Sequence, residues 1–179
     1  MAAETTTRLM VRDITSVKAF DATSGTRLEL ALRLKNGDIS WTVHQPDIVE
    51  TQDQNGAAIG VLRDGAETGR SEVTLNCDIF DVGDYSTDAV FLDLVEQDGK
   101  VGSTWVSTTS TESGETKTFG LEIIVANRGS AGALKGCTLT WAACRFVPPV
   151  TITGARDGFH ASGLTIRSMQ MKPTKVRTT

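Results

Sequence analysis

The sequence is poor in the side chains that most often catalyse reactions or bind metals. It holds only two histidines, His44 and His160, and three cysteines, Cys77, Cys137 and Cys144. Neither histidine has a carboxylate or cysteine at ligand spacing, and the cysteines lack metal-type spacing. No Gly-x-Ser-x-Gly motif of a serine nucleophile occurs. We therefore expect no catalytic residue, no metal and no cofactor. We interpret the cysteines as buried free thiols, with an interchain disulfide as the alternative.

Long apolar runs and an excess of positive charge are also missing. No run approaches the roughly 20 apolar residues that span a bilayer, and residues 1–8 lack the apolar core of a secretory signal peptide. We thus expect neither a membrane anchor nor secretion. Lys and Arg number 18 against 22 Asp and Glu, giving a net charge of -4. This balance argues against a nucleic-acid-binding module that is held by phosphate contacts.

What the sequence does contain is a strict alternation of apolar and polar residues, clearest at 27–44. Asn36-Gly37 interrupts this stretch, and this dipeptide tolerates the positive φ angles of a type I′ turn. We therefore predict a hairpin that places Leu32 opposite Trp41, with one apolar and one polar face. Its apolar residues are Leu28, Leu30, Leu32, Leu34, Ile39, Trp41 and Val43. In this register Trp41 belongs to the core, and we expect the same of Trp105 and Trp141.

The rest of the chain predicts a mainly β protein with a single domain over 1–179. Further strands are expected at 11–20, 72–78, 103–107, 117–125, 136–146, 150–153 and 159–171. One short helix is expected from a cap at Ser86 or Thr87 to Asp98-Gly99. These elements indicate an antiparallel β-sandwich or barrel of about eight or nine strands with one short flanking helix.

Three segments contain too few apolar residues for a helix or strand to be predicted in them. Residues 1–9 read as an N-terminal arm, 45–71 as a long polar loop, and 172–179 as a basic C-terminal tail. Internal loops of this length are uncommon in compact domains and are usually functional or disordered. We expect both arms to be disordered in the free subunit.

This layout resembles that of the tail tube (major tail) proteins of tailed bacteriophages. The similarity is strongest from Leu28 to Ile79, where the predicted hairpin leads through Pro46-Asp47 and Arg63-Asp64-Gly65 into Val73-Thr-Leu-Asn-Cys. The predicted helix lies where that family carries its flanking helix. The resemblance implies a virion protein that forms hexameric rings, stacked into a hollow tube through which DNA is delivered to the host.

The resemblance also implies where the working surfaces lie. The long loop of that family reaches a neighbouring ring, so its charged residues become candidates for an inter-ring interface. These are Asp47, Asp53, Arg63, Asp64 and Arg70. The polar faces of the strands become candidates for the lumen wall, with four charged residues expected to face the channel: Glu29, Arg33, Glu72 and Asp78. With three acids against one base, the field in the channel is expected to be negative and to hold DNA weakly.

As implied partners we expect further copies of this chain, together with tape measure, tail terminator and baseplate proteins, and a sheath if the tail is contractile. DNA would pass without specific binding, and the subunit would be made in the host cytoplasm before joining the virion tail. Two alternatives stay open at this point. One is another β-sandwich virion protein such as a tail terminator, and the other is a carbohydrate- or surface-binding β-sandwich module with exposed tryptophans.

Overall fold

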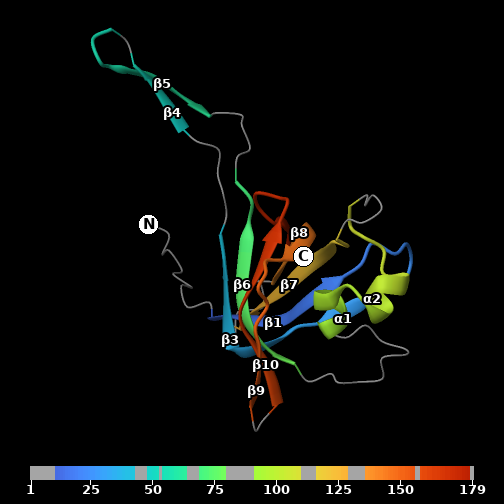
Figure 1. Cartoon of the computed structure of the whole chain (residues 1–179). Helices are drawn as coiled ribbons and strands as arrows, with labels where there is room; N and C mark the ends of the chain where they lie inside the picture. The colour runs from blue at the N-terminus through green and yellow to red at the C-terminus, as the bar shows by residue number, and fades with distance from the viewer. Residues whose placement is uncertain are drawn as a thin grey trace.

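The computed structural model describes residues 11–42, 48–52, 54–63, 69–79, 91–109, 116–128, 136–155 and 158–177. It is mainly β and antiparallel, as the sequence predicts (Figure 1). The strands are β1 (Val11–Phe20), β2 (Glu29–Ala31), β3 (Arg33–Trp41), β4 (Ile48–Gln52), β5 (Ala58–Arg63), β6 (Glu72–Ile79), β7 (Phe119–Arg128), β8 (Cys137–Phe146), β9 (Ile152–Ala155), β10 (Gly158–Ser168) and β11 (Thr174–Arg177). Two short helices are described, α1 (Phe91–Glu96) and α2 (Gly99–Thr104).

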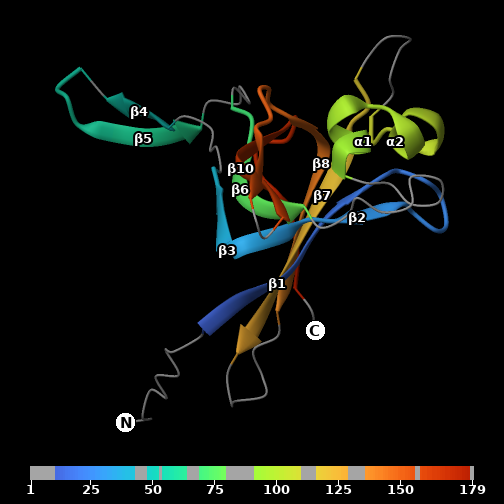
Figure 2. The same ribbon diagram turned by 60° about the horizontal axis from the view of Figure 1, so that its bottom comes forward.

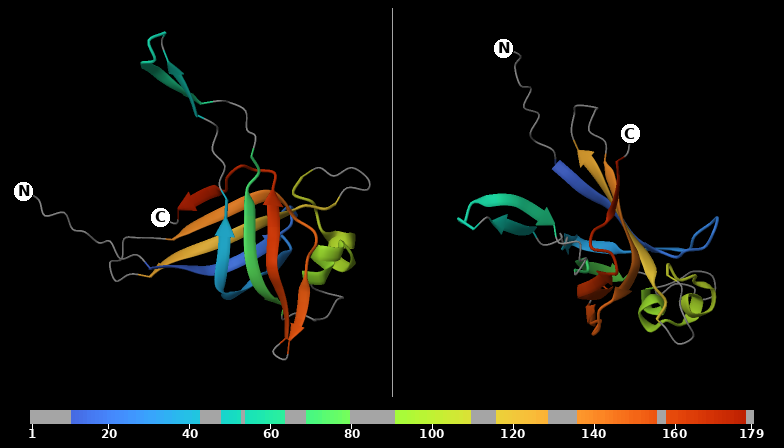
Figure 3. Two further views of the ribbon diagram at one scale, coloured as in Figure 1. Left: turned by 60° about the vertical axis from the view of Figure 1, so that its left-hand side comes forward. Right: turned by 90° about the horizontal axis from the view of Figure 1, so that it is seen from above.

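Nine of the strands form one sheet that curls almost into a barrel. Its order is β2-β1-β7-β8-β10-β6-β3, with β11 added beside β8 and β9 beside β10. The two end strands, β2 and β3, are separated in sequence only by Leu32, so the sheet must curl to bring its ends together (Figures 2 and 3). The Leu32 amide donates to the Val17 carbonyl at 2.8 Å and joins the two ends at this point.

Alternation in the central strands decides which side chains form the core. On β6, Val73, Leu75 and Cys77 are each 1% exposed, while the residues between them are half-buried. On β7 the inward residues are Phe119, Leu121, Ile123 and Val125, all buried as predicted. Period-two alternation thus places one apolar face inside the barrel and leaves the polar face outside.

The predicted hairpin at 27–44 is wrong. Asn36-Gly37 lies within β3, which continues past it and pairs with β6 instead. On the ladder, Leu34 pairs with Cys77 and Ile39 pairs with Leu75. Four residues of β3 therefore lie opposite one residue of β6, so the conformational freedom of Asn-Gly serves a bulge rather than a reversal of the chain.

The residues of the 27–44 stretch lie on the predicted apolar or polar face although β3 pairs with β6, with one exception. Leu30 and Leu32 are buried, and Glu29 and Arg33 are exposed. Trp41, however, pairs with Val73 near the end of the outermost strand and is 39% exposed, so its prediction as a core residue is wrong. Its ring meets the buried Trp141 edge-on, with centroids 6.3 Å apart.

The helical region is longer than the sequence predicts. Asp98-Gly99, expected to end the only helix, begins α2, because the Asp98 carboxylate accepts from the Gly99 amide at 2.7 Å. The strand expected at 103–107 is therefore wrong: Trp105 caps α2 and is 3% exposed. Among the described residues, no helix is long and apolar enough to cross a membrane.

The 45–71 segment is more regular than a polar loop. Its strands β4 and β5 form a two-stranded antiparallel sheet of their own, which stands apart from the barrel (Figure 1). The C-terminal segment also differs from its prediction, because β11 pairs with β8 from Thr174–Thr140 to Arg177–Cys137. The N-terminal arm at 1–9 and the expected cap at Ser86 or Thr87 lie outside the described residues.

Candidate functional site

The outer face of the barrel carries the four residues that were expected to line a channel. Arg33 on β3 is directly opposite Asp78 on β6, and Asp78 is in turn opposite His160 on β10. The Asp78 Oδ1 and His160 Nδ1 atoms are 2.6 Å apart. The Asp78 carboxylate on β6 thus has one basic residue on each side, Arg33 on β3 and His160 on β10.

His160 is a functional candidate that sequence reasoning misjudged. The sequence gives it no carboxylate or cysteine at ligand spacing, yet it is only 8% exposed and is hydrogen-bonded to a carboxylate. The cross-strand register brings Asp78 to it from 82 residues away. The sequence predicted that Asp78 points outward, which is a hint that it needs a polar partner. Only the pairing of β6 with β10 shows that this partner is His160.

Glu72 also has a basic partner on the same face. Its neighbour across β6 and β10 is Arg167, whose Nε donates to the Glu72 Oε1 at 2.7 Å. Both side chains are 38% exposed, so water screens this ion pair and its contribution to stability is modest.

Glu29 belongs to a larger charged cluster on the other side of the barrel. Lys18 donates to its Oε2 at 2.7 Å, and Arg27 donates to its Oε1 at 2.6 Å. These two hydrogen bonds hold the pKa of Glu29 below its usual value. Arg27 also reaches Glu122 at 3.2 Å and lies 4.3 Å from the centre of the Phe20 ring.

The predicted lumen acids are therefore each matched by a base: Glu29 by Lys18 and Arg27, Glu72 by Arg167, and Asp78 by His160. Counting acids along two strands could not reveal these partners, because they come from β1, the β1–β2 connection and β10. Glu29 and Glu72 are therefore paired with lysine or arginine side chains, and Asp78 is hydrogen-bonded to His160. That these residues face a channel stays a prediction.

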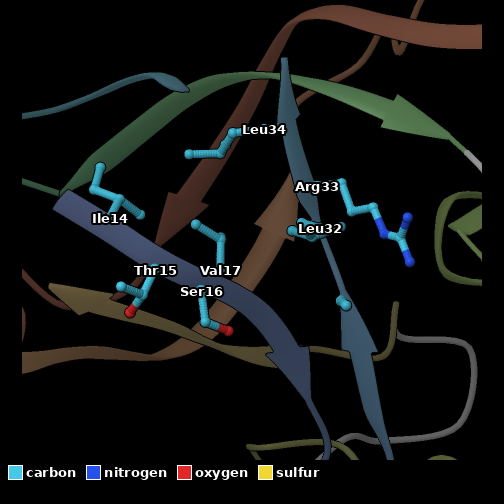
Figure 4. Close-up of a pocket in the computed structure, with 8 residues that line it drawn as sticks. Ile14, Thr15, Ser16, Val17, Leu32, Arg33 and Leu34 are labelled. Atoms are coloured by element: carbon cyan, nitrogen blue, oxygen red, sulfur yellow. The ribbon is translucent and has the colours of Figure 1, made fainter. Parts of the chain in front are cut away.

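A cavity of about 360 Å³ marks the line where the sheet fails to close. It lies between residues 14–17 of β1 and residues 31–34 at the start of β3 (Figure 4). Figure 4 shows Val17 and Leu34 pointing into this gap and Arg33 pointing away from it. Strand β2 pairs with β1 only from Lys18 to Phe20, and β3 has β6 as its only partner strand in the described part of the chain. Two strand edges therefore face each other here, joined by the hydrogen bond from the Leu32 amide to the Val17 carbonyl.

The candidate inter-ring residues fall on or near the β4–β5 hairpin. Asp47, Asp53 and Asp64 lie outside the described residues. Arg63 ends β5 and pairs with Ile48 on the ladder, and Arg70 is exposed just before β6. The structure shows the hairpin formed by β4 and β5. That these residues contact a neighbouring ring stays a prediction.

Asp21 is a buried carboxylate that sequence reasoning missed. It is 2% exposed and accepts hydrogen bonds from the Leu28 amide at 2.7 Å, from the Val106 amide at 3.3 Å and from the Thr23 hydroxyl. Burial raises its pKa, but these hydrogen bonds favour the charged form and outweigh burial, so that its pKa is lowered. Asp21 thereby joins the β1–β2 connection to the segment after α2, which is a structural role.

The cysteines offer no reactive site. Cys77 and Cys144 are buried, Cys137 is half-buried, and all three are free. Burial raises the pKa of Cys77 to about 11 and that of Cys144 to about 12, so both stay protonated at neutral pH. Within the described ranges, no group of three or more His, Cys, Asp or Glu side chains could hold a metal ion.

No protein family, curated protein or solved structure matches this chain.

Proposed function

We propose that this protein is a structural subunit of a bacteriophage tail tube, in which hexameric rings stack into a hollow tube for DNA delivery. The proposal combines the layout resemblance with features of the fold that a second copy of the chain would complete. It assigns assembly to the β4–β5 hairpin and to the open edges of the barrel, and passage of DNA to the polar outer face.

The projecting β4–β5 hairpin is the observation that carries the proposal. Its two strands pair only with each other and stand apart from the nine-stranded sheet. A two-stranded hairpin alone is marginally stable in water, because it has no third strand or layer on which to pack. The hairpin also contains the apolar residues Ile48, Val49, Ile59, Val61 and Leu62. A neighbouring ring would supply the surface that this hairpin lacks in one subunit.

The open line between β1 and β3 supports assembly within a ring. The exposed edges of two strands are prone to pairing with another chain, and natural proteins usually cover them. Here the edge of β3 that does not pair with β6 lies beside a gap of about 360 Å³, and no described strand covers it. In a ring, a head-to-tail contact of this kind would join one subunit's sheet to the next.

The charged outer face supports weak contact with DNA through balance rather than through net negative charge. Glu29 and Glu72 are paired with lysine or arginine side chains, so these parts of the wall would offer neither a strong attraction nor a strong repulsion to phosphates. This refines the expectation of a negative channel. The wall would be polar, its charged side chains would be paired within the subunit, and it would bind the passing DNA weakly.

The experiment is size-exclusion chromatography with negative-stain microscopy on the purified chain and on one hairpin variant. In the variant, residues 48–63 are replaced by a short Gly-Ser linker. We expect the unaltered chain to form tubes, and the variant to keep its thermal unfolding midpoint within a few degrees but to form none. The control is Gln54→Ser, a single exposed change at the hairpin tip, which should still give tubes.

The remaining outcomes identify the alternatives. A single ring that does not stack would favour a tail terminator, and a monomer under all conditions would favour a surface-binding module. That last alternative predicts exposed tryptophans; Trp41 is 39% exposed, whereas Trp105 and Trp141 are 3% and 0% exposed. Normal tubes from the linker variant would remove the hairpin from the assembly mechanism.

A further inference from the structure

A second concave surface lies on the opposite flank from the gap between β1 and β3. It is a groove of about 550 Å³ between the end of α1 and the chain that leaves β8. Its apolar lining comes from Val95 on α1, from Phe146 at the end of β8, and from Pro148 and Val150 beyond it. We call it the α1–β8 groove. Its volume lies in the range of sites that hold a small ligand or a few side chains.

The walls of the α1–β8 groove are held in place by contacts within the subunit. The Phe146 ring packs against Phe119 with centroids 5.0 Å apart and against Phe91 at 5.7 Å. On the α1 side, the Gln97 side chain donates to the Leu94 carbonyl and accepts from the Lys117 amide, both at 2.8 Å. A groove fixed in this way needs little rearrangement to receive a ligand, which lowers the entropic cost of binding.

Two arginines at the edge of the groove form an unfavourable pair. Arg145 on β8 lies directly opposite Arg167 on β10, and both line the groove. Like charges directly opposite each other destabilise an antiparallel pair. Arg167 is compensated by Glu72. The Arg145 side chain is exposed, and its guanidinium makes no hydrogen bond or ion pair with any residue of the described ranges. The fold therefore leaves one guanidinium unpaired beside an apolar surface.

We propose that the α1–β8 groove binds an acidic peptide segment of a partner protein, with a carboxylate on Arg145 and an adjacent apolar side chain over Phe146 and Val150. A guanidinium presents parallel N–H donors that match a carboxylate. The apolar lining fits a side chain next to that acid, which a phosphate backbone would not supply. The inference does not depend on tube formation, since the groove is built within one subunit.

Fluorescence anisotropy on the full chain would test this, with a fluorescein-labelled peptide of sequence Gly-Ser-Glu-Phe-Glu-Ser-Gly as the probe. We expect saturable binding that weakens about tenfold or more in Arg145→Gln, as when a charge-assisted hydrogen bond is lost. Lys172→Gln removes the same charge from another exposed position and should leave affinity within about twofold, as screened distant charges do. Thr116→Trp, which adds bulk to an exposed wall residue, should also abolish binding.

Two further measurements separate a binding role from a structural one. Arg145→Gln relieves the repulsion with Arg167, so its thermal unfolding midpoint should stay level or rise by about 1 °C. A probe with Gln in place of both Glu, or with Ser in place of Phe, should bind at least about tenfold more weakly if both subsites act. Equal binding by Arg145→Gln, an equal loss in Lys172→Gln, or indifference to Phe would overturn the proposal. Arg145-dependent binding of a labelled oligonucleotide in preference to the peptide would also overturn it.

Discussion

Strands β6 and β3 lie side by side and share an alternating pattern, but they differ in how well they are covered. β6 has β10 on one side and β3 on the other, and its inward residues Val73, Leu75 and Cys77 are each 1% exposed. Among the described strands, β3 has a neighbour on one side only, and Trp41 near its end is 39% exposed. Alternation decides which face a residue occupies, whereas the number of neighbouring elements decides how far that face is buried.

The centre of the barrel and its end strand β2 are also stabilised by different forces. The central part of the barrel relies on apolar packing, while polar contacts help to join β2 and the β1–β2 connection to it. Asp21 accepts two backbone amides at the β1–β2 connection, and the cluster of Lys18, Arg27 and Glu29 fastens β2 to β1. Mutations in the centre should therefore have large effects that do not depend on salt, and mutations at the end strands should have smaller effects that depend on pH or salt.

The largest expected effect is that of Trp141→Ala. Trp141 is fully buried and its indole N–H donates to the Ser71 hydroxyl at 3.0 Å. Truncation would leave a large cavity and remove the indole donor to the Ser71 hydroxyl, and should lower the free energy of unfolding by about 3–5 kcal/mol. Urea denaturation followed by circular dichroism measures this.

The matched comparison is Trp41→Ala, the same substitution 6.3 Å away at the edge of the sheet. Because Trp41 is already 39% exposed, it should lose less apolar contact and cost under about 2 kcal/mol. Equal losses from the two variants would show that the edge strand is as well packed as the centre, and that Trp41 belongs to the core after all.

An intermediate effect is expected for Asp21→Asn, with a dependence on pH. An amide can accept from only one of the two backbone amides, Leu28 or Val106, so the variant should lose about 1–3 kcal/mol at pH 7. The folded pKa of Asp21 lies below its ordinary value of 3.8. Its contribution is therefore complete above that value and is lost as the pH falls below it towards the folded pKa. Thermal unfolding from pH 7 to pH 2.5 should show the two proteins converging at the acid end.

Convergence should be absent if Asp21 is protonated in the folded protein at neutral pH. In that case the wild-type protein would keep its advantage over Asp21→Asn throughout the acid range. Such a result would contradict the polar account of how the β1–β2 connection is held.

The smallest expected effect is that of Lys18→Gln, which removes one ion pair to Glu29 on β2. The two side chains are 33% and 32% exposed, so the loss should be about 0.2–1 kcal/mol. In 1 M NaCl the difference from wild type should shrink further, because salt screens exposed charges. A loss that is unchanged by salt would indicate that the aliphatic stem of Lys18, rather than its charge, supports the end strand.

The error at Asn36-Gly37 has a definite physical cause. Leu34 and Ile39 are five positions apart, an odd number, yet both are packed against the core. A period-two strand cannot place both on one face unless the alternation shifts between them. A hairpin turn and a bulge both make that shift and both suit Asn-Gly. The choice depended on β6, which offers Cys77 and Leu75 as partners and lies far away in sequence.

The strand prediction around Trp105 is wrong for a different reason. A short stretch with one aromatic and two β-branched residues is compatible with a strand, but Asp98 caps the preceding residues into α2. Trp105 is then buried at the end of this helix, where its indole N–H donates to the Thr118 carbonyl at 3.3 Å. The burial was predictable from residue type, and the backbone conformation was not.

The sequence by itself determined the mainly β class, the inward faces of β6 and β7, the strand pair β9–β10 and the absence of common catalytic motifs. These follow from local periodicity and turn chemistry, which a short window of residues contains. Only the tertiary structure decided that β3 pairs with β6, that Asp78 meets His160, that the three acids have basic partners, and that Arg145 faces Arg167 beside an apolar groove. Such contacts join residues tens of positions apart, and their register depends on which strands become neighbours when the sheet curls.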